Sequence, residues 1–260
     1  MKVKEANKIA EKQLEKLAEA IKAGKSDAMK KYLATMSKFH RYSLRNQLLI
    51  FSQKQDASQV AGFKRWKKLG RWVKKGEKGI VIIAPIPLAR EVSADCDEPE
   101  IRFRARYVFD VSQTEGEALP EPSSVSGEPG EQLERLKEFA AKKGIGLEYE
   151  ENLGGADGIS KGGEIVIQSG LEKGNEFAVL AHEIAHELLH QGSDGKRESK
   201  QVRETEAESV AFVVSEAVGL ECGSACSDYI QLYKGDIETL EKSLTRIQKA
   251  SAEILSSLLG

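Results

Sequence analysis

Apolar residues in the first part of the chain recur with the spacing of an α-helix. Helical patterning runs over about residues 3–36, and a second apolar-periodic run follows in the stretch FHRYSLRNQLLIFSQKQ. A short helix that ends at Leu69 comes next, because Gly70 breaks the pattern. The first part of the chain is therefore predicted to be largely helical.

Beyond Gly70 the pattern favours strands. A strand at about residues 71–73, a turn rich in Lys and Gly, and a strand at residues 79–85 together predict a β-hairpin. Charged and apolar residues then alternate in IRFRARYVFDV, and this period of two predicts a further strand.

Periodicity is then lost over SQTEGEALPEPSSVSGEPGE, which contains three of the six prolines. Its content of Pro, Ser, Gly and Glu is typical of a linker or a long surface loop. We therefore predict an N-terminal domain at residues 1–111, a linker at residues 112–130 and a C-terminal domain at residues 131–260.

The C-terminal half combines helices with short strands. Helices are predicted at residues 132–143, 174–191, about 195–219 and about 236–259, and strands at residues 145–150 and 163–169. Together with the N-terminal pattern, this predicts an α+β fold in two domains.

Composition is that of a soluble globular protein, with 40% hydrophobic and 31% charged residues among 260. No apolar run approaches the roughly 18–20 residues of a membrane span, and no signal-peptide block is present, so we expect no membrane partner and a cytoplasmic location. Three cysteines (Cys96, Cys222 and Cys226) are too few for a disulfide framework, which fits a reducing compartment. We expect Cys222 and Cys226 to be thiols rather than a second metal site.

Charge is unevenly distributed although the net charge is only −2. Residues 38–90 contain 13 Lys and Arg against two acids, a net charge of +11, and the remaining 26 bases and 39 acids leave −13. This basic segment is expected to bind an anionic partner.

The sequence HEIAH at residues 182–186 matches the H-E-x-x-H pattern. Residues i and i+4 lie above one another on a helix, so His182 and His186 can bind one ion, and Glu183 can act as general base on a water at that ion. Both sides of this helix carry apolar residues, at Phe177, Leu180, Ile184 and Leu188 on one side and Val179 and Leu189 on the other. The helix is therefore predicted to be buried, and buried imidazoles need partners such as a metal.

His190 is not expected to bind the same ion. It lies eight residues beyond His182, roughly 12 Å along a helix axis, whereas zinc–nitrogen bonds are only about 2 Å long. We instead expect His190 to be a residue at the C-terminal end of the helix, where the helix dipole favours it.

A third ligand is expected from the helix that contains VRETEAESVAFVVSEAVG. Glu204 heads its apolar ridge, where an unpaired acid would cost several kcal/mol, so we assign Glu204 as the ligand. Glu208 is predicted either to orient an imidazole or to replace Glu204 as the ligand, and Glu206 is expected to be solvated. It remains open at this stage that both Glu204 and Glu208 merely solvate an acidic helix.

Two histidines and one glutamate leave an open coordination position, which is typical of catalytic zinc. The predicted reaction is hydrolysis of a peptide bond, with Glu183 as base and a protein as substrate. The strand at residues 163–169 is expected to offer an edge to an extended peptide, and Tyr229, or less favourably Tyr233, to stabilise the oxyanion.

The basic segment interleaves cationic and aromatic side chains. Cations neutralise phosphates and aromatic rings stack on unpaired bases, so we expect single-stranded nucleic acid to bind here with little sequence preference. The candidate residues that this interleaving indicates are Arg41, Tyr42, Trp66, Arg71, Trp72, Lys74, Lys75 and Lys78. For each tryptophan taken singly, a place in the core is an equally good interpretation.

These stretches resemble the ArdC-type antirestriction proteins, which join an N-terminal single-stranded-DNA-binding domain to a C-terminal zincin-like metallopeptidase domain. The N-terminal resemblance lies in FHRYSLRNQLLIFSQ, VAGFKRWKKLGRWVKKGEKGIVIIAP and VFDVSQTEGEALP. The C-terminal resemblance lies in HEIAHELLH, ETEAESVAFVVSEAVGL and SDYIQLYKGD. Together they cover the chain from about residue 37 to its end.

The resemblance implies DNA binding by Asn46 as well as by Trp66, Arg71 and the three lysines of the turn, and zinc at His182 and His186 with a downstream Glu. It also implies protection of mobile DNA from restriction. Two other interpretations remain open: a non-enzymatic DNA-protecting protein with a structural zinc site, and a regulatory protease that senses DNA damage.

Overall fold

The computed structural model describes residues 1–86, 102–119, 129–191, 199–220 and 236–260. By packing, the chain divides into two compact units. The N-terminal unit comprises Met1–Glu15 and Arg45–Pro120, and the C-terminal unit comprises Lys16–Leu44 and Glu121–Gly260. Among the described residues, no helix has the length and apolar character that crossing a membrane would require.

The first two helices are α1 (Val3–Lys22) and α2 (Ser26–Lys38), so the long predicted helical run is interrupted at Gly24, which has a φ of 78°. Met29, Leu33 and Met36 form one face of α2, and all three are fully buried. Because α2 packs against a helix of the C-terminal unit, α7 (Lys200–Ala217), it belongs to that unit. The unit boundary thus differs from the predicted domain at residues 1–111.

The N-terminal unit contains helices α3 (Leu44–Gln53) and α4 (Phe63–Lys68) with two small antiparallel sheets. The strands of this unit are β1 (Val60–Ala61), β2 (Arg71–Val73), β3 (Ile80–Ile86), β4 (Arg102–Asp110) and β5 (Thr114–Gly116). One sheet has the order β1-β4-β3, and the other pairs β2 with β5. The predicted β2–β3 hairpin is therefore wrong, since β3 pairs with β4 from Ile80 opposite Val108 to Ile86 opposite Arg102.

The partner of β2 comes from the stretch that we predicted to be linker. A short 3-10 helix, η1 (Val111–Gln113), is capped at its N-terminus by Asp110, whose carboxylate accepts a hydrogen bond from the Ser112 N–H at 2.9 Å. Gln113 then fixes the turn after β2, because its amide donates to the Lys78 carbonyl at 2.9 Å. Gly116 is required in β5, since a Cβ there would collide with the Gly70 carbonyl. These tertiary contacts order residues 111–116 despite their lack of periodicity.

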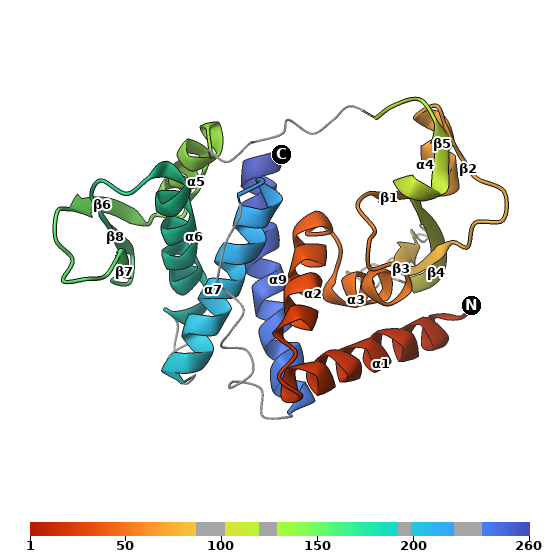
Figure 1. Cartoon of the computed structure of the whole chain (residues 1–260), viewed down its shortest axis with the longest axis horizontal. Helices are drawn as coiled ribbons and strands as arrows, with labels where there is room; N and C mark the ends of the chain where they lie inside the picture. Colours follow the sequence, from red (N-terminus) through yellow and green to blue (C-terminus); the bar gives the residue numbers. More distant parts are fainter. Residues whose placement is uncertain (87–101, 120–128, 192–198, 221–235) are drawn as a thin grey trace, which may run out of the picture. The chain divides into compact units, whose positions relative to one another are not determined.

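The C-terminal unit combines helices with a three-stranded sheet (Figure 1). Besides α2 and α7, its helices are α5 (Glu131–Lys142), α6 (Lys173–His190) and α9 (Ile237–Leu259), and its strands are β6 (Gly146–Glu150), β7 (Gly158–Ser160) and β8 (Glu164–Gln168). The sheet order is β6-β8-β7, with β6 parallel and β7 antiparallel to β8. Strand β7 lies in a Gly-rich stretch between the two predicted strands, where the sequence predicted no strand.

Strand β8 is central, and its residues Ile165, Val166 and Ile167 are fully buried. Both of its backbone edges are occupied by β6 and β7. The expectation that this strand offers an edge to a peptide is therefore wrong, and the edge strand beside α6 is β7.

Candidate functional site

The H-E-x-x-H residues lie on α6, which packs against β7 and β8 on one side and against α7 on the other (Figure 1). Phe177, Leu180 and Ile184 are fully buried in this arrangement. The helix is thus enclosed on two sides, as its two apolar stripes predicted.

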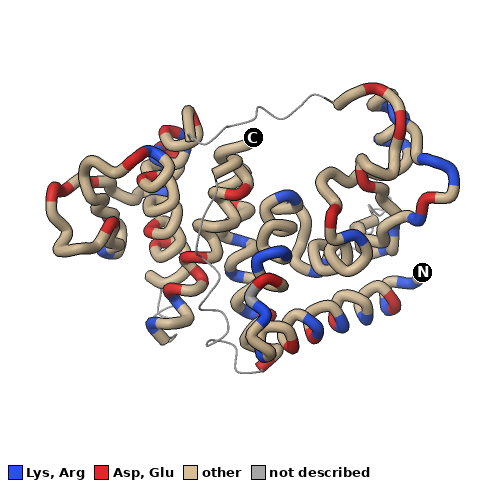
Figure 2. The backbone as a smooth tube through the Cα atoms, viewed as in Figure 1, with Lys and Arg blue, Asp and Glu red and all other residues tan. Residues whose placement is uncertain are grey.

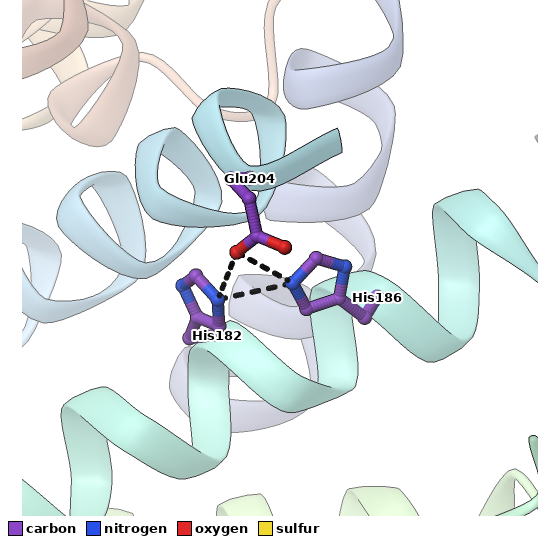
Figure 3. A group of neighbouring side chains, drawn as sticks. All are labelled: His182, His186 and Glu204. Carbon is purple, nitrogen blue, oxygen red and sulfur yellow. Dashed lines mark hydrogen bonds and ion pairs between the residues drawn. The ribbon is translucent and has the colours of Figure 1, made fainter. Parts of the chain in front are cut away.

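Three side chains from α6 and α7 point toward one another (Figure 3). The Nε2 atoms of His182 and His186 are 3.0 Å apart, and Glu204 Oε2 is 3.6 Å from the first and 3.5 Å from the second. Among the described residues, these three form the group of His, Cys, Asp and Glu side chains whose ligand atoms converge, all within 4.8 Å of one another.

These separations fit one bound ion. Ligand atoms about 2.0–2.1 Å from a tetrahedral zinc lie about 3.3 Å from each other, which is close to the three separations in the cluster. The structure therefore brings together the three residues predicted as ligands. One part of the reasoning fails, because the Glu204 side chain is 49% exposed rather than buried at the head of an apolar ridge.

Burial sets the protonation of the two imidazoles. Burial lowers the pKa of His182, although the negative charge of Glu204 acts to raise it. Burial, together with the neighbouring His182, lowers the pKa of His186 to about 4. At neutral pH both rings are then neutral and have a lone pair to offer, which is the state that a metal ligand requires.

Glu183 points toward the sheet edge beside this cluster. Burial, followed by the charge of Glu204, raises the pKa of Glu183 to about 7, although a hydrogen bond from the Ser160 backbone opposes the rise. A Cβ at Gly158 would lie 2.9 Å from Glu183 Cγ, so β7 passes directly against this side chain. A carboxyl group with a pKa near neutrality is suited to proton transfer.

Glu187 fastens the same helix to the turn between β7 and β8. Its carboxylate accepts the backbone N–H of Gly162 at 2.9 Å and that of Gly163 at 2.7 Å. The position of β7 relative to α6 is thus set by two successive glutamates on α6, Glu183 and Glu187.

Glu206 is fully buried, so the expectation that it is solvated is wrong. Burial alone would raise the pKa of Glu206, but hydrogen bonds from His190, Ser243 and Arg246 together lower it. Glu208 is not among the three residues that converge, and the Nδ1 atom of His186 lies 3.1 Å from Nδ1 of His190. The apolar ridge of α7 was too coarse a guide to separate these three glutamates.

Tyr229, its alternative Tyr233 and the three cysteines Cys96, Cys222 and Cys226 lie outside the described residues.

Part of the basic segment forms an exposed surface on the N-terminal unit. Trp72 on β2 is 52% exposed, and Lys74, Lys75 and Lys78 are exposed in the turn that follows. Figure 2 shows the cationic positions gathered along α4 and this turn. The Lys74 ammonium donates to the Ser112 carbonyl at 3.0 Å, whereas the side chains of Lys75 and Lys78 have no hydrogen-bond or ion-pair partner within the described part of the chain.

Other residues of the segment are built into the fold. Trp66 is 2% exposed and its Nε1 donates to the Phe109 carbonyl at 2.8 Å, so its assignment to DNA is wrong. Asn46 bonds both backbone groups of Ile83 on β3, each at 2.8 Å, and this explains its presence without DNA. Arg71 donates from Nε to Thr114 Oγ1 at 2.8 Å and from Nη1 to the Glu117 carbonyl, which joins β2 to the end of β5.

Arg41 and Tyr42 belong to the C-terminal unit rather than to the unit that contains Trp72. Arg41 donates to the carbonyl of Gly260, and the Tyr42 ring meets Phe39 edge-on at a centroid distance of 6.0 Å. Both lie within the basic segment in sequence but in a different unit from Trp72 and the turn that follows it.

Exposed residues on β4 were missed. Phe103 and Tyr107 are 56% and 52% exposed, and Arg104 and Arg106 are exposed on the alternate positions. Tyr107 lies against Gly79 beside the basic turn, since a Cβ at Gly79 would be 3.0 Å from Tyr107 Cβ. The alternating arginines of IRFRARYVFDV could have indicated this exposed surface. They lie outside residues 38–90, the segment over which the charge was counted.

The family model of the N-terminal domain of the anti-restriction factor ArdC matches residues 6–135, which is half of the chain. This chain belongs to the ArdC family. The ArdC model covers the basic surface but ends before the H-E-x-x-H helix, so the family assignment rests on the N-terminal half.

Solved ArdC structures agree with the whole architecture. The Mn(II)-bound ArdC protein of plasmid R388 matches over 97% of this chain and 98% of that chain, with a TM-score of 0.57 at 18% identity. Its metal-free form matches over 84% of this chain and 85% of that chain, with a TM-score of 0.52. The likeness confirms the predicted α+β fold.

An uncharacterized protein of Bacillus anthracis, pXO2-81, is 27% identical over 272 residues. The match covers 86% of this chain and 46% of that protein. The ArdC-type chain thus spans about half the length of the curated relative that it matches.

Proposed function

We propose that this chain is a zinc-dependent peptidase with a surface for single-stranded DNA, and that it protects mobile DNA from restriction. The observation that carries the peptidase part is the convergence of His182, His186 and Glu204 beside a buried Glu183. The Mn(II)-bound R388 protein supports binding of a divalent metal, and the donor set of two imidazoles and one carboxylate favours zinc at this cluster.

The three ligands leave room for a substrate or a water in a fourth position. A bound zinc ion supplies Lewis acidity, which polarises a peptide carbonyl and acidifies a water molecule. Glu183 accepts the proton of the attacking water on its carboxylate and delivers it to the amine that leaves. The pKa of about 7 that burial gives this side chain suits both directions of transfer.

Strand β7 supplies the edge along which a peptide substrate can lie. It is the outer strand of its sheet, and it passes against Glu183 at Gly158. A peptide that pairs with the free edge of β7 through main-chain hydrogen bonds would be held in an extended form beside the proposed base. Such recognition depends on the backbone and favours a flexible segment of a protein substrate.

The DNA part of the proposal is supported by the family and by the exposed residues of the N-terminal unit. Trp72 and Tyr107 offer ring faces for stacking, and Lys75 and Lys78 offer charges for phosphates. Within the described residues, neither lysine side chain makes a hydrogen bond or an ion pair with the protein. Binding through stacking and phosphate contacts predicts little preference for base sequence.

The peptidase part is tested with Glu183→Gln. The purified wild-type protein should contain about one zinc per chain by elemental analysis. It should also cleave a degenerate fluorogenic peptide mixture, with and without an oligothymidine strand present. The variant should keep its zinc and lose cleavage by at least about 100-fold, because the general base is removed. Equal cleavage by the variant contradicts the assigned base, and zinc without any cleavage favours the non-enzymatic DNA-protecting protein.

A further inference from the structure

The ring of His186 has a partner on the side that faces away from the three converging ligands. His186 Nδ1 lies 3.1 Å from Nδ1 of His190, which follows one helical turn later on α6. The other ring nitrogen of His190, Nε2, lies 3.1 Å from Glu206 Oε2 on α7. His190 is 4% exposed and Glu206 is fully buried, so this chain of contacts is shielded from water.

Helix α9 holds Glu206, the last residue in this series of contacts. Arg246 donates to Glu206 Oε1 from Nε at 3.1 Å and from Nη2 at 2.6 Å, and the Ser243 hydroxyl donates to the same oxygen. A guanidinium carries only donors, so the atom that faces it must be an acceptor. Oε1 is thereby committed to α9, and Oε2 is left to accept from His190.

The proton positions follow from this fixed end. Because Oε2 accepts, a neutral His190 ring must hold its proton on Nε2, which leaves a lone pair on His190 Nδ1. That lone pair can accept only if His186 holds its own proton on Nδ1. His186 Nε2 is then unprotonated, and it is the atom that faces His182 and Glu204.

We propose that His190 and Glu206 are positioning residues that hold His186 in the tautomer able to bind metal. This inference rests on the proposed metal site, and it gives a role to the third histidine of HEIAHELLH, to the buried Glu206 and to the end of α9. Without these contacts to His190 and Glu206, the His186 ring could carry its proton on either nitrogen. The fraction of rings with a proton on Nε2 could not bind the metal through that atom. Groups that orient a ligating imidazole in this way affect metal affinity by about 10–100-fold when they are changed.

The variant Glu206→Gln reverses the order of protons without changing the shape of the side chain. Arg246 still requires an acceptor, so the amide oxygen takes the place of Oε1 and the amide NH₂ faces His190. His190 must then accept on Nε2 and carry its proton on Nδ1, which forces His186 to accept on Nδ1 and to hold its proton on Nε2. Glu216→Gln is the matched control, because Glu216 is an exposed residue of the same helix.

Two measurements on the full chain test the proposal. Nitrogen-15 chemical shifts of the histidine rings in metal-free protein report the tautomers, and competition with a chromophoric chelator reports zinc affinity. We expect the Nδ1–H tautomer of His186 in wild type and in Glu216→Gln, and the Nε2–H tautomer in Glu206→Gln. Zinc affinity should fall by about 10–100-fold in Glu206→Gln and by less than about twofold in the control.

The outcomes separate this proposal from the proposed function. An unchanged His186 tautomer in Glu206→Gln overturns the inference, even if zinc affinity falls. A wild-type protein that binds no zinc overturns the metal site, while the shifts still decide whether Glu206 sets the tautomer. If Glu206→Gln does not fold, His190→Phe replaces it. Its His186 should show both tautomers and weaker zinc binding, and a single Nδ1–H tautomer there contradicts the proposal.

Discussion

Two regions of the molecule differ in how strictly their function fixes each side chain: the converging ligands of α6 and α7, and the basic segment of residues 38–90. His182, His186 and Glu204 were predicted from spacing along helices, and they lie within reach of one ion. The basic segment was predicted from composition and from the family resemblance, and of its candidates Trp66, Asn46 and Arg71 serve the fold. A site defined by directional geometry can thus be inferred residue by residue, whereas a charged segment indicates only the kind of partner.

The difference has a physical cause. A metal ligand must place one atom within a few tenths of an ångström, so few residues of a sequence qualify. Phosphate binding depends on charge over a wide area, and any exposed Lys or Arg contributes to it. A tryptophan or an arginine in such a segment can therefore belong equally well to the core.

Loss of a ligand should have the largest effect. His182→Ala removes one of three ligands, so we expect the zinc content to fall from about one per chain to near zero. Elemental analysis of the purified proteins measures this, with Glu216→Gln as the control that keeps its zinc. Retention of stoichiometric zinc by His182→Ala would show that the ion is bound elsewhere.

The two tryptophans provide the sharpest test of the basic segment. Trp66→Ala should lower the free energy of unfolding by about 3–5 kcal/mol, because a buried ring is lost and the Phe109 carbonyl loses its donor. Trp72→Ala, at an exposed position, should change that free energy by no more than about 0.5 kcal/mol. Urea denaturation measures both.

The same pair should show the reverse order in DNA binding. Trp72→Ala should weaken binding of a labelled oligothymidine by about 1–3 kcal/mol if its ring stacks on a base. Fluorescence anisotropy measures this under conditions where both variants are folded. An unchanged affinity for Trp72→Ala would remove this ring from the proposed DNA surface.

Asn46→Ala should destabilise the N-terminal unit by about 1–3 kcal/mol, since it leaves the N–H and the carbonyl of Ile83 without their amide partner. Ser52→Ala on the same helix, where the hydroxyl donates to the Leu49 carbonyl, should cost less. Thermal unfolding compares the two. Equal stability of wild type and Asn46→Ala would argue for a role of Asn46 outside the fold.

The smallest effects are expected from the turn lysines. Lys75→Gln and Lys78→Gln should leave stability within about 0.5 kcal/mol of wild type, because both side chains are exposed. Each should reduce the slope of log affinity against log salt by about 0.7 if it contacts one phosphate of a single strand. Binding titrations at several salt concentrations measure the slope, and an unchanged slope would exclude that lysine from the contact.

Local spacing in the sequence was sufficient for the helices and for the ligand pair. The i, i+4 relation between His182 and His186 is fixed by helix geometry, and the apolar stripes of α6 predicted its enclosure. Glu204 lies in the cluster as assigned although the argument from burial failed, and the packing of α7 against α6 is what brings it to the two histidines.

Contacts between distant segments governed the rest. Strand β2 pairs with β5 rather than β3, Trp66 is buried while Trp72 is exposed, and β7 rather than β8 has the free edge. Glu206 differs from Glu204 because α9 brings Arg246 and Ser243 to it. Spacing along one element shows which side chains share a face, but burial, strand pairing and hydrogen-bond partners depend on which other element that face meets.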